Sequence, residues 1–146
     1  MTLEFNQPDW QSEPNMQKTK VLVVDDEPSI RNVCSVILRK NGFDPLLATD
    51  GLEGLSTFEE RHEEICLVLS DIVMPRMDGI EMARMLFVRY DHPNIIMMSG
   101  HHMSKLLPED LKRLCSIIQK PFTANGLVEA VRKCLHYQEE HHPDAH

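Results

Sequence analysis

The run Val21-Leu22-Val23-Val24 is continuously apolar and rich in β-branched residues, which is typical of a β-strand covered on both faces. Such a strand needs helices on either side of its sheet, so the chain is restricted to a layered α/β arrangement. The acids Asp25-Asp26-Glu27 follow, and Pro28-Ser29 begins a predicted helix that ends at Asn41-Gly42. The predicted buried face of this helix has helical spacing: Ile30, Val33, Cys34, Ile37 and Leu38.

The alternation of strand and helix repeats along the chain. We expect four more strands, at Phe43–Thr49, Cys66–Asp71, Asn94–Ser99 and Ser116–Gln119. Pro45 interrupts the second strand and predicts that it lies at a sheet edge, because proline cannot donate a hydrogen bond to a neighbouring strand. Five strands alternating with helices predict a parallel sheet with right-handed crossovers. The length of 146 residues suits an open doubly wound sheet rather than an eight-stranded barrel.

Helix starts are marked in the later part of the chain. Asp50 with Glu53, and Asp78 with Glu81, each place an acid before a helix and a glutamate three residues further on. Pro108 suits the first position of a helix, so we expect a short helix over residues 108–114 behind an irregular loop.

Composition excludes several classes of partner. The net charge of −8 argues against direct binding of nucleic acid, which needs a basic face. No apolar run approaches the ~18–20 residues of a membrane span, and no signal peptide pattern is present. We therefore expect a cytoplasmic protein with no membrane contact. Its predicted parts are a flexible leader over residues 1–18, one domain over residues 19–137, and a flexible acidic, histidine-containing tail over residues 138–146.

The four cysteines are expected to be buried free thiols: Cys34, Cys66, Cys115 and Cys134. Each lies among apolar residues, no two form a CxxC pair, and no export signal points to an oxidising compartment.

Polar side chains follow the predicted strands at their carboxyl ends, where chemistry gathers in an open α/β sheet: Asp25, Asp26, Asp71, Ser99 and Lys120. Two carboxylates about 4 Å apart repel by roughly 4 kcal/mol at an effective dielectric near 20. A hard divalent cation such as Mg²⁺, which prefers oxygen ligands, removes that cost. The cluster therefore suits a phosphoryl group, with Asp71 as nucleophile and with Lys120 and Mg²⁺ neutralising charge on the transferring oxygens.

Four motifs occur in order: Asp25-Asp26-Glu27, the run DIVMPRMDG from Asp71, Ser99-Gly100 and Lys120-Pro121-Phe122. Together they resemble the receiver domain of response regulators in two-component signalling, over about residues 20–135. The similarity is to the single-domain, chemotaxis-regulator type. It implies a flavodoxin-like (βα)5 fold with a five-stranded parallel sheet in the order 2-1-3-4-5.

The resemblance also implies a role for each residue at this edge. Asp71 would be the phosphoacceptor, Ser99 the switch hydroxyl and Lys120 the phosphate-pairing lysine, followed by a cis bond to Pro121. The Mg²⁺ ligands would be Asp26, Asp71 and the backbone carbonyl of Val73, with Asp25 acting through water.

The chain departs from the family pattern at the position where many receivers have tyrosine or phenylalanine, which here is Ile117. The glycine-alanine pair that usually precedes it is replaced by Arg113-Leu114. An isoleucine has no polar tip to display on activation. We therefore expect activation to order the loop Gly100–Leu107 rather than to move residue 117.

Four functions remain to be separated. A free-standing response regulator would accept a phosphoryl group from a phosphohistidine of a histidine kinase or phosphotransfer protein. It would catalyse only its own phosphorylation and dephosphorylation, and would signal to an unknown downstream protein. The chain could instead be a receiver module of a hybrid kinase or phosphorelay. The complete acceptor set argues against a phosphorylation-independent scaffold. Val73 argues against a Mg²⁺ phosphatase, because that class needs a second acid two residues after the nucleophile.

Overall fold

The computed structural model describes residues 19–100 and 106–141, and for residues 137–141 it describes the backbone only. The strands are β1 (Lys20–Val24), β2 (Asp44–Ala48), β3 (Ile65–Asp71), β4 (Ile95–Ser99) and β5 (Ser116–Gln119). The helices are α3 (Pro28–Lys40), α4 (Gly51–Arg61), α5 (Gly79–Arg89), α6 (Pro108–Arg113) and α7 (Ala124–His141). All five predicted strands are present. The predicted leader and residues 142–146 of the predicted tail lie outside the described part.

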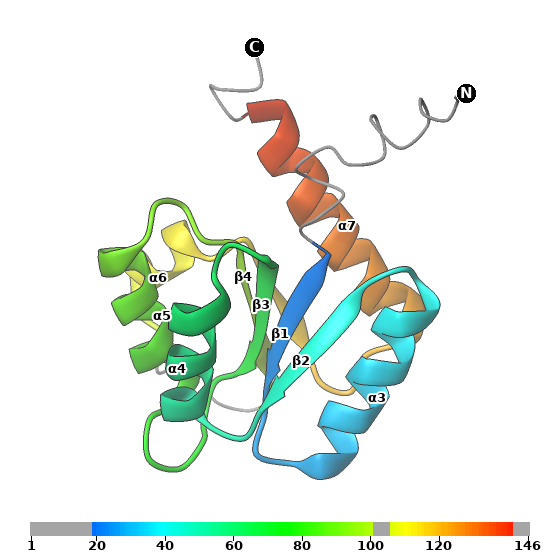
Figure 1. The fold of residues 1–146 in the computed structure, drawn as a ribbon, viewed down its shortest axis with the longest axis horizontal. Helices are drawn as coiled ribbons and strands as arrows, with labels where there is room; N and C mark the ends of the chain where they lie inside the picture. Colours follow the sequence, from blue (N-terminus) through cyan, green and yellow to red (C-terminus); the bar gives the residue numbers. More distant parts are fainter. Residues whose placement is uncertain (1–18, 101–105, 142–146) are drawn as a thin grey trace, which may run out of the picture.

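The strands form one parallel sheet in the order β2-β1-β3-β4-β5 (Figure 1). Helices α3 and α7 cover one face, and α4, α5 and α6 cover the other. This is the doubly wound fold and the strand order that the resemblance implies. Among the described helices, none has the length and apolar character that crossing a membrane requires.

Strand β1 is buried on both sides, as its continuous apolar run predicts. Val21 and Val23 belong to the core beneath α3 and α7, whereas Leu22 and Val24 belong to the core beneath α4 and α5. None of the four has any exposed surface. Successive side chains of a strand point to opposite faces, so one short run supplies two cores.

The helix ends follow the local signals. Pro28 is the first residue of α3, and the chain leaves this helix through Asn41 and Gly42, whose φ is +89°. Helix α5 begins with a complete capping box between Asp78 and Glu81. One prediction about α3 is wrong: Val33 is 47% exposed, because the helix contacts the sheet over a narrower stripe than the apolar pattern suggests.

The two edges of the sheet differ in how they are held. Strand β2 carries Pro45 and lies at an edge, as predicted. Strand β5 forms the other edge and has no fully buried side chain. The adjacent helix α6 starts at Pro108, as predicted, and buries only Asp110, which accepts hydrogen bonds of 3.0 and 2.7 Å from Arg84 of α5.

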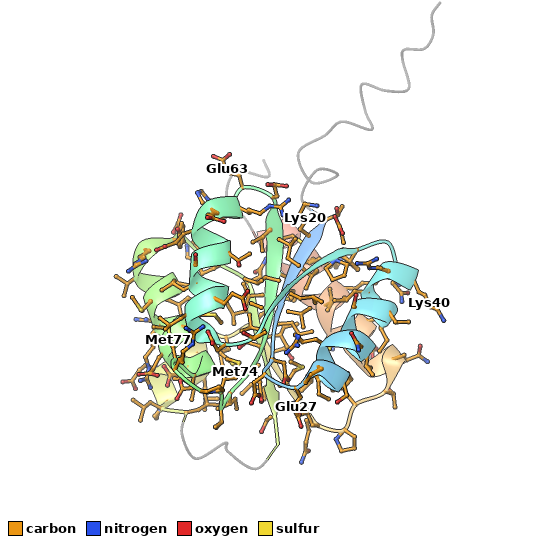
Figure 2. All side chains as sticks on the ribbon, turned by 60° about the horizontal axis from the view of Figure 1, so that its bottom comes forward. Lys20, Glu27, Lys40, Glu63, Met74 and Met77 are labelled. Atoms are coloured by element: carbon orange, nitrogen blue, oxygen red, sulfur yellow. A yellow bond between two sulfur atoms is a disulfide. The ribbon has the colours of Figure 1, made fainter. Side chains whose placement is uncertain are left out.

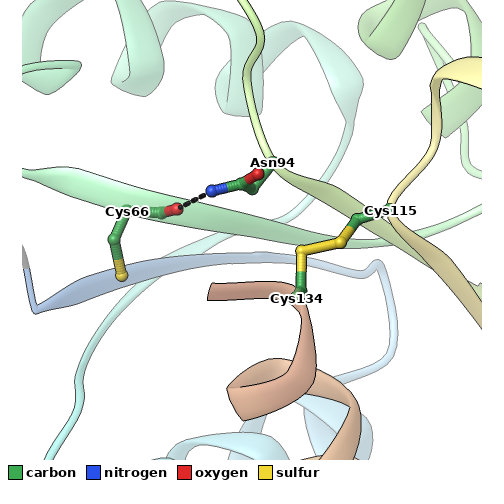
Figure 3. Close-up of a disulfide and its surroundings, with 4 residues drawn as sticks. All are labelled: Cys66, Asn94, Cys115 and Cys134. Atoms are coloured by element: carbon green, nitrogen blue, oxygen red, sulfur yellow. Dashed lines mark hydrogen bonds between the residues drawn. A yellow bond between two sulfur atoms is a disulfide. The ribbon is translucent and has the colours of Figure 1, made fainter. Parts of the chain in front are cut away.

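A disulfide joins Cys115, just before β5, to Cys134 of α7 (Figure 3). The expectation of four buried free thiols is therefore wrong for this pair. Cys34 is buried as predicted, whereas Cys66 is only partly buried, and neither forms a disulfide. The two α-carbons are 5.9 Å apart although the residues are 19 positions apart. Packing of α7 beside the start of β5 creates this proximity, and local sequence does not reveal it. Helix α7 also continues to His141, past the predicted domain end at residue 137.

Candidate functional site

The carboxyl ends of four strands bring the predicted site residues to one edge of the sheet. Strand register pairs Val24 with Ser70 and Ser99 with Gln119, so the residues that follow β1 and β5 lie beside the ends of β3 and β4. In Figure 2 the labelled Glu27 lies toward this edge, opposite Lys20 and Glu63. The register explains why acids, a hydroxyl and an ammonium that are far apart in sequence converge here.

Three acids form the centre of the site. Asp25, Asp26 and Asp71 each offer a carboxylate oxygen, and these atoms lie within 4.8 Å of one another. Asp25 is fully buried, Asp71 is half-buried and Asp26 is exposed. Oxygen-only donors with one open side are the ligand set that suits Mg²⁺, which keeps several waters in protein sites. The residues present therefore fit a hard divalent cation.

Lys120 connects these acids electrostatically. Its Nζ donates a hydrogen bond of 3.0 Å to Asp25 Oδ2 and lies 3.5 Å from Asp71 Oδ1. Glu27 Oε1 is 3.7 Å from the same nitrogen, which adds an acid that the predicted ligand set omitted. The backbone N–H of Lys120 donates to the Ser99 carbonyl over 2.7 Å, and the bond to Pro121 is cis, as the resemblance implies.

The carboxyl group of Asp71 is held in a defined orientation. Its Oδ1 accepts a hydrogen bond of 2.9 Å from the backbone N–H of Ile72. Burial and the nearby charge of Asp25 raise the pKa of the Asp71 carboxyl, and Lys120 offsets part of this increase. Burial and Asp25 thus destabilise the ionised form of Asp71, although Lys120 lies nearby. A ligand that neutralises the charge of Asp71 is therefore favoured.

Ser99 presents a buried hydroxyl at the end of β4. Its Oγ is enclosed and has no hydrogen-bond partner among the described residues. Leaving a buried polar group unsatisfied costs about 1–3 kcal/mol. A hydroxyl at the end of β4, beside the acid cluster, is therefore available to donate to a ligand oxygen.

The segment after Asp71 approaches the strand so closely that only glycine fits at residue 79. A Cβ there would lie 2.0 Å from the Asp71 carbonyl oxygen and 2.8 Å from Ser70 Oγ. The N–H of Gly79 donates to the carbonyl of Ile72 over 2.8 Å. This close return explains the final glycine of DIVMPRMDG. Val73 lies inside the segment and is half-buried, and the proposed use of its carbonyl as a ligand stays a prediction.

Sequence reasoning also missed a contact between the segment after Asp71 and α4. Arg76 Nε donates to Asp50 Oδ2 over 2.7 Å, joining the segment after Asp71 to the start of α4. The sequence indicated Asp50 only as a helix cap, and the arginine carried no signal. Ile117 packs at the edge of the core beneath α4 and α5. The loop expected to respond to activation lies largely outside the described residues, since 101–105 are among those not described.

The response regulator receiver domain family matches residues 21–132, and the chain belongs to this family. Sporulation initiation phosphotransferase F of Bacillus subtilis is 30% identical over 122 residues, covering 82% of this chain and 96% of that protein. Sensor kinase CckA of Brucella abortus is 36% identical over 124 residues, covering 82% of this chain and 13% of that protein. Probable transcriptional regulator ycf27 of Porphyridium aerugineum is 35% identical over 120 residues.

Solved structures agree with the family assignment. A response regulator receiver domain protein from Clostridium thermocellum superposes with a TM-score of 0.78 at 27% identity, covering 84% of this chain and 98% of that one. The fold is therefore the flavodoxin-like receiver fold. The chain spans 49% of the ycf27 relative and 13% of the CckA relative, so it corresponds to one domain of those longer proteins.

Proposed function

We propose that this receiver domain accepts a phosphoryl group on Asp71 from a phosphohistidine of a histidine kinase or histidine phosphotransfer protein. The observation that carries the proposal is the arrangement of Lys120 between Asp25 and Asp71, together with the buried hydroxyl of Ser99, which has no hydrogen-bond partner among the described residues. A structural ion pair alone would need neither a third acid, Asp26, nor the buried hydroxyl of Ser99 at the same end of the sheet. An incoming phosphoryl group would use all of them.

In the proposed transfer, an Asp71 carboxylate oxygen forms a bond to phosphorus. The bond between phosphorus and the imidazole nitrogen breaks, and the imidazole takes up a proton. The ammonium of Lys120 stabilises negative charge on the phosphoryl oxygens, and Ser99 Oγ donates a hydrogen bond to one of them. The Ile72 N–H keeps the nucleophilic carboxyl oriented. Positioning and electrostatics therefore supply the catalysis.

The Mg²⁺ site is proposed at Asp26 and Asp71 with the Val73 carbonyl, and with Asp25 acting through water. Asp25 already accepts hydrogen bonds from Lys120 and from the Glu27 N–H, which supports an indirect role. When bound, Mg²⁺ would neutralise charge on the acids and on the phosphoryl oxygens.

The domain is proposed to act on no separate substrate, so it would catalyse only its own phosphorylation and dephosphorylation. Its output would be altered contact with a downstream protein, in the cytoplasm, without direct binding of nucleic acid or membrane.

A second candidate is a receiver module of a hybrid kinase or phosphorelay. The similarity to part of a sensor kinase and to nearly all of a phosphotransferase supports that alternative.

Incubation with acetyl phosphate and Mg²⁺, followed by intact mass and peptide mapping, tests the acceptor. We expect the mass of one phosphoryl group, located on Asp71 and absent from Asp71→Asn. Asp91→Asn is the control, because Asp91 is exposed and lies before β4, at the amino ends of the strands and away from the acid cluster. Equal labelling of Asp71→Asn would overturn the assignment.

A further inference from the structure

The segment over residues 72–78, which we name the acceptor loop, connects Asp71 to α5 and contains Val73. Backbone hydrogen bonds close it at two places. The Gly79 N–H donates to the Ile72 carbonyl over 2.8 Å, and the Gly51 N–H donates to the Met77 carbonyl over 2.8 Å. The second bond ties the loop to the first turn of α4. The conformation of the acceptor loop therefore depends on its position relative to α4.

Arg76 occupies an unusual backbone conformation inside the acceptor loop. Its φ is +67°, a region that non-glycine residues seldom adopt. The Met77 N–H donates to the Pro75 carbonyl over 2.8 Å, so residue 76 is the centre of a tight three-residue turn. Such a conformation persists only where the surroundings hold it in place.

The side chain of Arg76 supplies that restraint. Its Nε donates to Asp50 Oδ2 over 2.7 Å, and Asp50 is only 4% exposed. The other oxygen of Asp50 accepts the Glu53 N–H over 2.9 Å as the cap of α4. Burial alone would raise the pKa of the Asp50 carboxyl, but these hydrogen bonds outweigh it and hold the pKa below its usual value. A rigid, ionised carboxylate thus anchors the strained turn.

We propose that Arg76 is a positioning residue for the metal: its pairing with Asp50 holds the acceptor loop, and hence Val73, in the conformation that binds Mg²⁺ beside Asp71. This inference rests on the proposed function and extends it to two residues outside the acceptor set. Within the described part of the chain, the Arg76 side chain pairs with Asp50 and forms no hydrogen bond or ion pair with Asp71 or the proposed metal ligands. It acts through the loop that carries one ligand, so its loss should affect metal affinity more than the chemical step.

The test compares Arg76→Ala and Asp50→Asn with the wild type. Asparagine caps helices as well as aspartate does, so Asp50→Asn keeps the cap and removes the charge that Arg76 contacts. Arg84→Ala is the matched control. The Arg84 side chain is 43% exposed and pairs at 2.7 Å with the Asp110 side chain, which is 10% exposed. The Arg76 side chain is 60% exposed and pairs at 2.7 Å with the Asp50 side chain, which is 6% exposed.

Calorimetric titration with MgCl₂ measures the affinity for Mg²⁺. Labelling with acetyl phosphate at several Mg²⁺ concentrations gives two separate quantities: the Mg²⁺ concentration at half-maximal rate, and the maximal rate of phosphorylation. We expect Arg76→Ala and Asp50→Asn each to weaken Mg²⁺ binding by about tenfold, the lower end of the effect of outer-shell partners. The maximal rate should change by less than about threefold, because the reacting groups are intact. The double variant should lose no more affinity than either single one, since both remove the same contact.

Arg76→Gly gives a further readout. Glycine adopts positive φ without strain, so this variant should retain more affinity than Arg76→Ala if loop conformation is the cause. The result that overturns the inference is Mg²⁺ binding equal to wild type in Arg76→Ala and Asp50→Asn, whatever their melting temperatures. An equal loss of Mg²⁺ affinity in Arg84→Ala would also overturn the inference, because loss of any such arginine–carboxylate pair would then weaken Mg²⁺ binding. A wild-type protein that binds no Mg²⁺ would overturn the proposed function too, so the two failures are distinguishable.

Discussion

The ammonium of Lys120 lies 3.0 Å from Oδ2 of Asp25, a carboxylate that has no exposed surface. The two residues are 95 positions apart, and β3 and β4 separate the strands that they follow. The lysine therefore reaches across the end of the sheet to neutralise a buried acid. The same contact links stability to the proposed acceptor site, because Lys120 also lies 3.5 Å from Asp71.

Replacing Lys120 by methionine should destabilise the domain. The variant leaves Asp25 buried without its cation, and breaking a buried pair on one side costs about 3 kcal/mol. Urea unfolding without Mg²⁺ at pH 7 measures the loss, with exposed Lys112→Met of α6 as the control. Equal unfolding midpoints for the wild type and Lys120→Met would show that Asp25 does not depend on this partner.

Replacing Asp71 by asparagine should stabilise the metal-free domain at neutral pH. Burial and the charge of Asp25 raise the pKa of Asp71 in the folded state, so the folded state holds this proton more tightly than the unfolded state does. Ionisation therefore costs stability as pH rises above the unfolded pKa of about 3.9. The gain in melting temperature should be largest near pH 7 and should vanish as pH falls below that value. A gain that is constant with pH would refute the electrostatic cause.

Replacing Asp26 by alanine should separate metal binding from folding. Asp26 is exposed, so its loss should change unfolding free energy by less than about 0.5 kcal/mol. Mg²⁺ affinity should fall by more than about tenfold, since even the outer partners of metal ligands contribute that much. Calorimetry with MgCl₂ checks the affinity, and Asp91→Asn serves as the control. An unchanged dissociation constant would remove Asp26 from the ligand set.

Reduction of the disulfide between Cys115 and Cys134 should lower stability. The bond closes a short loop, 19 positions from end to end, and bonds of this kind contribute about 3 kcal/mol. It also fastens α7 to β5, an edge strand with no fully buried side chain. Urea unfolding with and without reductant measures the effect, and Cys115→Ser should be insensitive to reductant. A wild type whose midpoint does not respond to reductant would contradict the prediction.

The helix and strand pattern was predictable because its causes are local. The continuous run at residues 21–24 requires cover on two faces, Pro45 requires an edge, and Asp78 with Glu81 forms a cap within one turn. The positions of Asp71 and Lys120 were predictable as strand ends, and parallel strands bring such ends to one edge. The sequence alone therefore determined the fold class and the strand-end residues of the site, but not the approach of Glu27 to Lys120.

Tertiary packing decided what depends on distant partners. The sequence showed Asp25 as one acid of several, and only the fold buries it beneath Lys120. Local pattern likewise gave Cys115 the surroundings of a buried thiol, but the approach of α7 to β5 makes it half of a disulfide. Arg76 carried no signal at all. Its proposed role depends on the carboxylate of Asp50, 26 residues earlier, which caps α4. Such long-range contacts follow from the docking of elements rather than from the residues within them.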